Sequence, residues 1–218
     1  MKKHMMIVFD LEWNGGWGKV KLNEVLQIGA VKLARLGGPV VDSFRAFVKP
    51  VVHKKLNRAA KGLAFSAGEL EQGDSFAAVL ERFLTWCGED YVLASWGGND
   101  LRELQANADF WKLKLNLPRT ALDLQVAAGR AAGTKNDVAL SAMAEYFGLP
   151  DSVEPHDALN DAFYAALVGE MAVLLCGEEV LHNCTRPGLS APLRDLRPYV
   201  IHTGPRCGGF PQEQDALS

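Results

Sequence analysis

Short apolar runs with strand-like composition mark the first half of the chain. The runs are MMIVFD (5–10), EVLQIGAVKLARL (24–36), VVDSFRAFVKP (40–50) and YVLASW (91–96); they are rich in Val, Ile, Leu and aromatic residues. The Gly-rich LGGP between the second and third runs predicts a hairpin connection. The fourth run has the continuous apolar character of a buried strand.

Segments with apolar residues at helical spacing occupy most of the remaining chain. They are 74–87, 99–110, the second half of 120–133, 137–148 and the long apolar segment 156–176. Three strands followed by alternating strands and helices predict an α/β fold, with one mixed β-sheet flanked by α-helices. From about residue 184 the chain is rich in Pro, Gly and Arg, so we expect a folded domain at 1–183 and an irregular extension at 184–218.

The overall composition is that of a folded globular protein. Of 218 residues 48% are hydrophobic, and the formal net charge of −3 argues against a protein that coats nucleic acid through bulk charge. No run approaches the roughly 18 apolar residues of a membrane span, and the first apolar run is too short for a secretory signal. The four cysteines form no CxxC pair, so we expect no zinc site, and Cys87 and Cys176, which lie in helix-like apolar runs, are predicted to be buried free thiols in a reducing compartment. We therefore expect a cytoplasmic protein with no membrane segment.

Two acids at the end of the first apolar run carry the first chemical signal. Asp10 and Glu12 are one residue apart, and on a strand residues two positions apart share a face. Their carboxylates would repel each other and be costly to desolvate. A bound metal ion would explain the pair, and so would a strand that runs out into a solvated acidic turn. Alone, the pair leaves both interpretations open.

Two further segments place acids at the starts of predicted helices. Asp100 follows the fourth strand across a Gly-Gly turn, where it could simply be a first-turn acid that stabilises its helix. In PHDALNDAFYAAL, Asp161 lies five residues after His156 inside an otherwise apolar run. An acid there is unusual unless it is paired or binds a metal. Asp157 competes with Asp161 for that role, but an ordinary role at the helix N-terminus is open to it.

Together these segments supply four carboxylates and one histidine, a set suited to phosphodiester hydrolysis with two metal ions. Carboxylate oxygens favour Mg²⁺ or Mn²⁺ over softer ions. Two such ions can activate a water molecule and stabilise the leaving 3′-oxygen. A neutral histidine nearby can take the proton from that water.

Three motifs then carry a family resemblance. FDLEWN, SWGGND and HDALNDA, in this order, resemble the exonuclease motifs of the DEDDh 3′–5′ exonucleases, in the ribonuclease H-like superfamily. EVLQIGAV, FVKP and DSFAAVLERFLTWC resemble the same family, so the similarity covers about 5–176. The sister class would have tyrosine at the position of Asp157. The resemblance implies a ribonuclease H-like sheet, His156 as general base, and two Mg²⁺ or Mn²⁺ ions on Asp10, Glu12, Asp100 and Asp161.

The resemblance also implies the substrate, which is the 3′ end of single-stranded nucleic acid. Nucleotides would leave one at a time as nucleoside 5′-monophosphates. SWGGNDLRELQANADF is most similar to the branch that trims RNA 3′ ends, which favours RNA over DNA. The alternatives are a DNA exonuclease for proofreading or repair and, from another class, a nucleic-acid-binding module without turnover.

The sequence departs from the family just after the first motif, where many relatives have Thr or Ser. Here the residues are Trp13 and Asn14. We predict that Trp13 stacks on a base and that Asn14 forms a hydrogen bond with the terminal nucleotide; packing of Trp13 under the glycine turn is the alternative. The segment KPVVHKKLNRAAKG (49–62) is the densest positive stretch, and it either guides phosphates toward the site or is a solvated basic loop.

Overall fold

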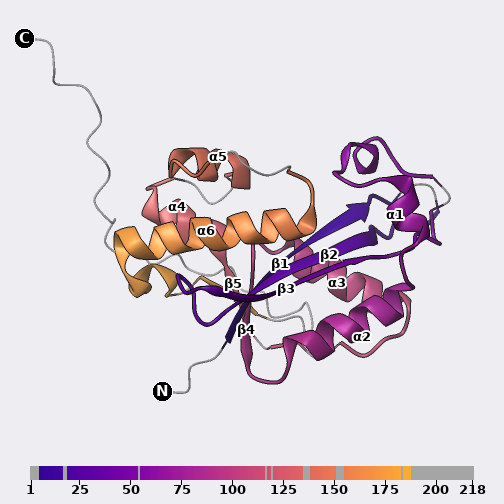
Figure 1. Ribbon diagram of the computed structural model, residues 1–218, viewed down its shortest axis with the longest axis horizontal. Coiled ribbons are helices and arrows are strands. Elements are labelled where there is room, and N and C mark those ends of the chain that lie inside the picture. The colour runs from indigo at the N-terminus through magenta and orange to yellow at the C-terminus, as the bar shows by residue number, and fades with distance from the viewer. Residues whose placement is uncertain are drawn as a thin grey trace, which may run out of the picture.

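A twisted sheet runs through the middle of the molecule, with helices on both faces (Figure 1). The structure is a computed structural model, and it describes residues 5–16, 19–53, 55–115, 117–118, 120–134, 138–150, 155–182 and 184–187. Within these residues six strands form one sheet, in the order β3-β2-β1-β4-β5-β6. They are β1 (Met5–Asn14), β2 (Glu24–Leu33), β3 (Val40–Phe47), β4 (Tyr91–Ser95), β5 (Thr120–Asp123) and β6 (Thr185–Pro187).

The sheet is mixed, as predicted. β1 pairs antiparallel with β2, and β2 with β3, whereas β4 lies parallel to β1 and β5 parallel to β4. β6 closes the far edge by pairing antiparallel with β5. Because parallel strands need a crossover, the chain passes through a helix between β4 and β5.

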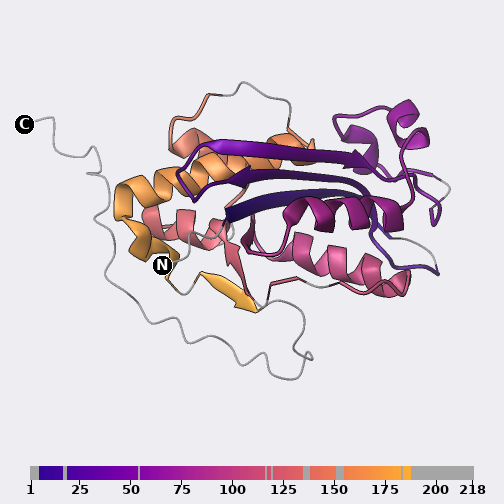
Figure 2. The same cartoon turned by 60° about the horizontal axis from the view of Figure 1, so that its bottom comes forward.

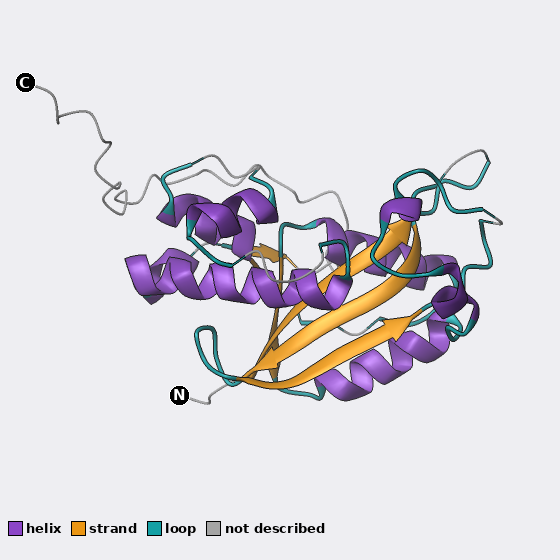
Figure 3. Ribbon diagram, turned by 45° about the horizontal axis from the view of Figure 1, so that its top comes forward, coloured by secondary structure: helices purple, strands orange, loops and turns teal. Residues whose placement is uncertain are grey.

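Helices cover the two faces separately, as Figures 2 and 3 show. α2 (Phe76–Cys87) and α3 (Asn99–Phe110) lie on one face, and α6 (Ala158–Cys176) lies on the other, next to α4 (Leu124–Ala131) and α5 (Leu140–Tyr146). Shorter elements connect them: η1 (Ala60–Gly62) and α1 (Ala67–Glu71) lie between β3 and α2, and η2 (Glu178–Leu181) follows α6.

Side-chain alternation along β1 divides the core into two layers. Phe9 and Leu11 belong to the apolar cluster beneath α2 and α3. Met6 and Val8 belong to the cluster beneath α6. Since side chains alternate along a strand, the next even-numbered residues, Asp10 and Glu12, also face the α6 side.

Most predicted elements occur where the sequence places them, and the differences concern where they begin and end. β1 does not end at Asp10 but continues through both acids to Asn14, because β2 remains paired with it along that length. α5 is shorter than predicted and starts at Leu140. The predicted boundary at 183/184 does not end the sheet, since β6 follows it; residues 188–218 of the predicted extension lie outside the described residues.

α6 is the central helix of its face. By length and apolar composition it is the one helix among the described residues that could cross a membrane. In this fold its buried positions instead pack on β1, β2 and α4, as the core helix of a folded domain does. Its N-terminal end therefore reaches the sheet next to the acids of β1.

Candidate active site

The acids of β1 lie beside the position where the first turn of α6 packs directly on the sheet. Asp10 is paired across the strands with Gly29 of β2, and Glu12 with Gln27. A Cβ atom on Gly29 would lie 2.1 Å from the backbone of Ala158 and Leu159. Only a glycine at position 29 therefore lets the first turn of α6 rest directly on the sheet, beside Asp10 and Glu12.

Gln27 fastens that first turn to the sheet. Its Nε2 donates to Oδ2 of Asp157 at 2.9 Å, and its Oε1 accepts from the backbone N–H of Ala158 at 2.8 Å. Arg45 of β3 completes the contact, with a guanidinium nitrogen 2.5 Å from the same Oδ2. We call Gln27, Arg45 and Asp157 the α6 clamp.

Asp157 and Asp161 thus have different surroundings. Asp157 is buried at the N-cap of α6, where Oδ1 accepts from the backbone N–H groups of Leu159 and Asn160. Its Oδ2 accepts from Gln27 and forms the ion pair with Arg45. Asp161, one turn later, points toward His156, whose backbone N–H donates to Oδ2 of Asp161 at 3.1 Å. Asp157 is therefore fully engaged in structure, and Asp161 is the acid that faces the site.

His156 is held in an unusual backbone conformation. Its φ angle is +64°, in the left-handed region where residues other than glycine are uncommon. Its N–H donates to Asp161, and its carbonyl accepts from the backbone N–H of Ala64 at 3.0 Å. These two contacts position the histidine at the junction between α6 and the segment after β3.

Asp100 reaches the site from the opposite face of the sheet. It lies in the first turn of α3, is buried, and its Oδ1 accepts from the backbone N–H of Leu11 at 3.3 Å. Leu11 is the residue between Asp10 and Glu12, so this hydrogen bond ties α3 to the acidic part of β1. From the sequence alone, Asp100 could have been an acid that only stabilises the first turn of its helix. In the structure the same position also places it beside the acids of β1.

The structure brings Glu12, His156 and Asp161 together, and Asp10 and Asp100 lie close enough to interact electrostatically with these acids. One possible ligand atom from each of Glu12, His156 and Asp161 lies within 4.8 Å of the other two. Asp10 joins them electrostatically, since burial and then the carboxylates of Asp100 and Glu12 raise its pKa well above the ordinary value. This cluster we call the acid centre.

Burial and mutual repulsion make it unfavourable for the carboxyl groups of the acid centre to be ionised together. Burial, followed by the carboxylate of Asp161, raises the pKa of Glu12 to about 8. Burial raises the pKa of Asp100 to about 7, against the lowering effect of the hydrogen bond from Leu11. The pKa of Asp161 is also raised, again mainly by burial. Hard cations with oxygen ligands would remove this repulsion, so the donor set fits Mg²⁺ or Mn²⁺.

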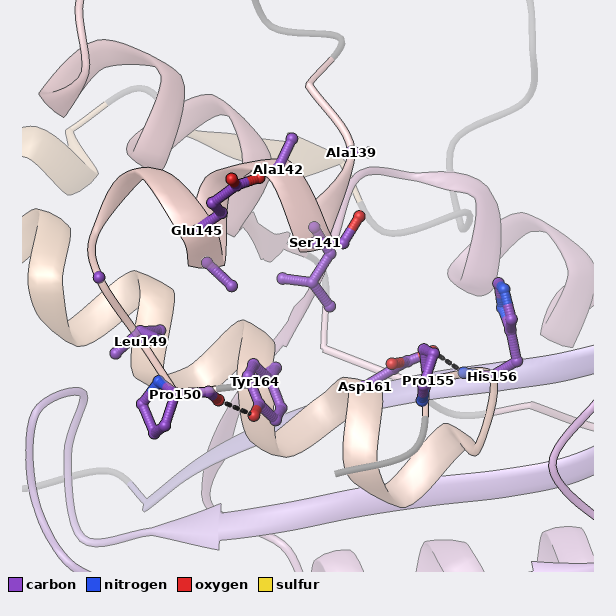
Figure 4. A pocket seen from close by; sticks show the side chains of 13 residues that line it. Ala139, Ser141, Ala142, Glu145, Leu149, Pro150, Pro155, His156, Asp161 and Tyr164 are labelled. Carbon is purple, nitrogen blue, oxygen red and sulfur yellow. Dashed lines mark hydrogen bonds between the residues drawn. The ribbon is translucent and has the colours of Figure 1, made fainter. Parts of the chain in front are cut away.

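A cavity of about 850 Å³ opens next to the acid centre. Figure 4 shows it between α5 and the first turns of α6, with His156 and Asp161 at one end and Glu145 and Ser141 across it. Tyr164, one turn beyond Asp161, donates to the carbonyl of Pro150 and so holds the wall of the cavity to α6.

The residues predicted to contact the nucleotide are placed differently. Asn14 is fully buried: its Nδ2 donates to the carbonyl of Lys55 at 3.1 Å, and its Oδ1 accepts from the N–H of Asn57 at 2.9 Å. Both ends of the Asn14 amide therefore have hydrogen-bond partners within the protein, and its contact with a nucleotide stays a prediction. Trp13 is partly buried against the core cluster beneath α2 and α3, which favours the packing alternative over base stacking. A bulge in β1 between Glu12 and Trp13 shifts the register there.

Sequence reasoning missed the α6 clamp and Gly29. Gln27 did carry a signal, because a polar amide in the apolar run EVLQIGAV needs a buried partner. Arg45 carried none, since a half-exposed arginine on an edge strand is ordinary.

Comparison with known proteins supports an exonuclease fold. The family model described as Exonuclease (RNase_T) matches residues 7–168, and a search of curated protein sequences gave no match. The nuclease domain of 3′hExo, a DEDDh family member bound to rAMP, is similar with a TM-score of 0.70 and 18% identity, over 79% of this chain and 92% of that chain.

Two other solved structures show the same likeness. Cell-death related nuclease 4 (CRN-4) has a TM-score of 0.68 and 21% identity, over 79% of this chain and 64% of that chain. E. coli exonuclease I in complex with a 5cy-dA13 oligonucleotide has a TM-score of 0.59 and 15% identity, over 78% of this chain and 40% of that chain. The expected ribonuclease H-like exonuclease fold is therefore confirmed.

Proposed function

Because the chain belongs to the RNase_T exonuclease family, we propose that it is a metal-dependent 3′–5′ exonuclease that shortens single-stranded nucleic acid and releases nucleoside 5′-monophosphates. One observation carries the mechanistic part of the proposal. Glu12, His156 and Asp161 place possible ligand atoms within 4.8 Å of one another, and the buried carboxylates of Asp10 and Asp100 interact electrostatically with those of Glu12 and Asp161. A fold that only bound nucleic acid would gain nothing from acids that repel phosphates.

Asp10, Glu12, Asp100 and Asp161 are the residues that would hold the metal ions. Two divalent ions supply charge stabilisation of the phosphodiester and activation of water. The protein contributes rigidity, since β1, α3 and α6 each carry ligands and are joined by the Leu11–Asp100 hydrogen bond and the α6 clamp. A prearranged set of ligands pays no reorganisation cost when substrate arrives.

His156 is the residue we assign as general base. Its imidazole must be neutral to take a proton from the attacking water. Its backbone is fixed by Asp161 and Ala64, so the side chain starts from a defined position beside the acids. After the phosphodiester bond breaks, the leaving 3′-oxygen takes up a proton to become a hydroxyl.

We favour RNA as the substrate, with DNA as the alternative. Among structurally similar proteins, 3′hExo is bound to rAMP, a 3′-exonuclease recognises a histone mRNA stem-loop, and E. coli exonuclease I is bound to a DNA oligonucleotide. The fold thus accommodates both chemistries. The motif similarity to the RNA-trimming branch supports RNA.

The test uses single-stranded RNA and DNA of one sequence, each labelled at the 5′ end. With Mg²⁺ or Mn²⁺ we expect a ladder of products that shortens from the 3′ end, with RNA degraded faster, and no products in EDTA. Faster degradation of DNA would establish the alternative substrate. If neither strand shortened with either metal, the enzymatic proposal would be rejected in favour of a binding module.

A further inference from the structure

The segment after β3 forms a basic edge beside the acid centre. Lys55, Arg58 and Lys61 of this segment have exposed side chains, and Lys54 lies outside the described residues. The connection between β1 and β2 adds exposed Lys19 and Lys21. The chain has no acidic residue from 43 to 68 or from 13 to 23. We call the five described cations the basic rim.

Hydrogen bonds fix the backbone of this segment to the strands of the site. Buried Glu24, the first residue of β2, accepts from the N–H groups of Val51, Val52 and His53 at 2.6, 2.7 and 3.0 Å. The ring of His53 lies 2.8 Å from the carbonyl of Leu22. A loop anchored in this way presents its charges from a defined position, unlike a loosely solvated one.

Further contacts join the rim to the acid centre itself. Asn14 bonds the carbonyl of Lys55 and the N–H of Asn57, and Asn14 is only two residues beyond Glu12 in β1. Two strand residues span about 7 Å, so the rim begins within one nucleotide's reach of the acids. Asn57 Oδ1 also accepts from Ala60 N–H at 2.8 Å, which orders the turn that carries Arg58.

Electrostatics explains why an exonuclease would need this rim. The chain carries a net charge of −3, and the acid centre repels phosphates wherever metal does not neutralise it. Attraction of a polyanion must therefore come from a local group of cations. In Figure 1 the segment before α1 lies at the end of the sheet where β1 ends, next to the start of α6.

We propose that the basic rim binds the backbone phosphates of the strand on the 5′ side of the bond being cut, and so determines affinity for long substrates. This inference rests on the proposed function for its location, but binding can be measured without turnover. It assigns the rim no base contact, so affinity should vary little with sequence.

The experiment compares Arg58→Glu with Arg35→Glu. Arg35 is an exposed arginine at the β2–β3 turn, at the opposite end of β2 and about 30 Å away along the strand, so it is a matched charge reversal outside the rim. Binding of a fluorescent single-stranded 20-mer is followed by anisotropy in EDTA. We expect Arg58→Glu to weaken binding at least about 10-fold and Arg35→Glu to change it less than about twofold.

The salt dependence of strand binding then measures how many phosphates the basic rim contacts. A triple variant replaces Lys55, Arg58 and Lys61 with glutamine. The slope of log affinity against log salt concentration should become less steep by about 2, because each phosphate contact on a single strand contributes about 0.7. The p-nitrophenyl ester of thymidine 5′-monophosphate has one phosphate and no upstream strand, so its hydrolysis should be unchanged in this variant.

The outcomes separate the two proposals. If Arg58→Glu and Arg35→Glu weakened binding equally, or if the salt slope of the triple variant were unchanged, the proposed role of the basic rim would be overturned. Loss of ester hydrolysis in the triple variant would also overturn it, because the lysines would then be acting within the acid centre. A wild-type protein that binds the 20-mer through the rim but hydrolyses neither ester nor strand with metal would overturn the proposed function and leave the rim intact.

Discussion

Replacing Glu12 with glutamine tests whether the acid centre is assembled at a cost in stability. Without metal, burial and the neighbouring carboxylates raise the pKa of Glu12 from 4.5 to about 8. Between these pH values the folded protein keeps a proton on Glu12 that the unfolded chain has released. The free energy of unfolding must therefore fall as pH rises through that window. Glutamine has no proton to lose, so the variant lacks this contribution.

The size of the effect follows from the two pKa values. Between about pH 5 and about pH 8, Glu12 alone should lower the unfolding free energy of the metal-free wild-type protein by about 3 kcal/mol relative to Glu12→Gln. Urea unfolding followed by circular dichroism in EDTA, at several pH values, measures this difference. Glu71→Gln, which changes an exposed acid of α1, is the matched control and should parallel the wild type.

Parallel pH profiles for wild type and Glu12→Gln would refute this reasoning, because they would show that Glu12 ionises as readily in the folded protein as in the unfolded chain. Metal provides a second check. Mg²⁺ supplies the missing positive charge, so it should restore the stability of the wild type at about pH 8 and stabilise the variant less.

Three further variants test other parts of the site. His156→Ala should lower kcat by roughly two to four orders of magnitude in a 3′-end assay, whereas His182→Ala, at an exposed position, should not. Asp161→Asn should abolish turnover while thermal unfolding in EDTA shows an unchanged or higher midpoint, since repulsion is relieved. Gly29→Ala should destabilise the fold by about 2–4 kcal/mol in urea, because its Cβ would overlap α6; Gly68→Ala, with room for a Cβ, should not.

Much of the fold was predictable because hydrophobic periodicity is strong in the elements that form it. The apolar run before Asp10, the helical spacing of apolar residues in α3 and the long apolar segment of α6 each form the element that they predict. Periodicity cannot show where a strand stops, and β1 continues through two charged residues because hydrogen bonding to β2 holds it. β6 has only three residues, too few to produce a pattern.

The site was predictable where residues are chemically unusual for their position. Asp161 inside an apolar helix and two acids on one strand face both signal function. The structural hydrogen bonds of Asn14 could not be predicted, because an amide next to a glycine turn can bind a ligand or a loop equally well, and the neighbouring Lys55 and Asn57 are more than 40 residues away in sequence. The α6 clamp depends on contacts between segments 130 residues apart, which no local pattern reports.

That separation has a consequence for how the enzyme is made. β1 and β2 are synthesised first, but Gln27 meets Asp157 only after a further 130 residues have been added. At typical synthesis rates this takes roughly 6–26 s. Throughout that interval the nascent chain holds Asp10 and Glu12 without Asp161 or His156, so a half-made protein is expected to have no nuclease activity. The first turn of α6 can pack on Gly29 only after this interval, and we expect that packing to complete the acid centre.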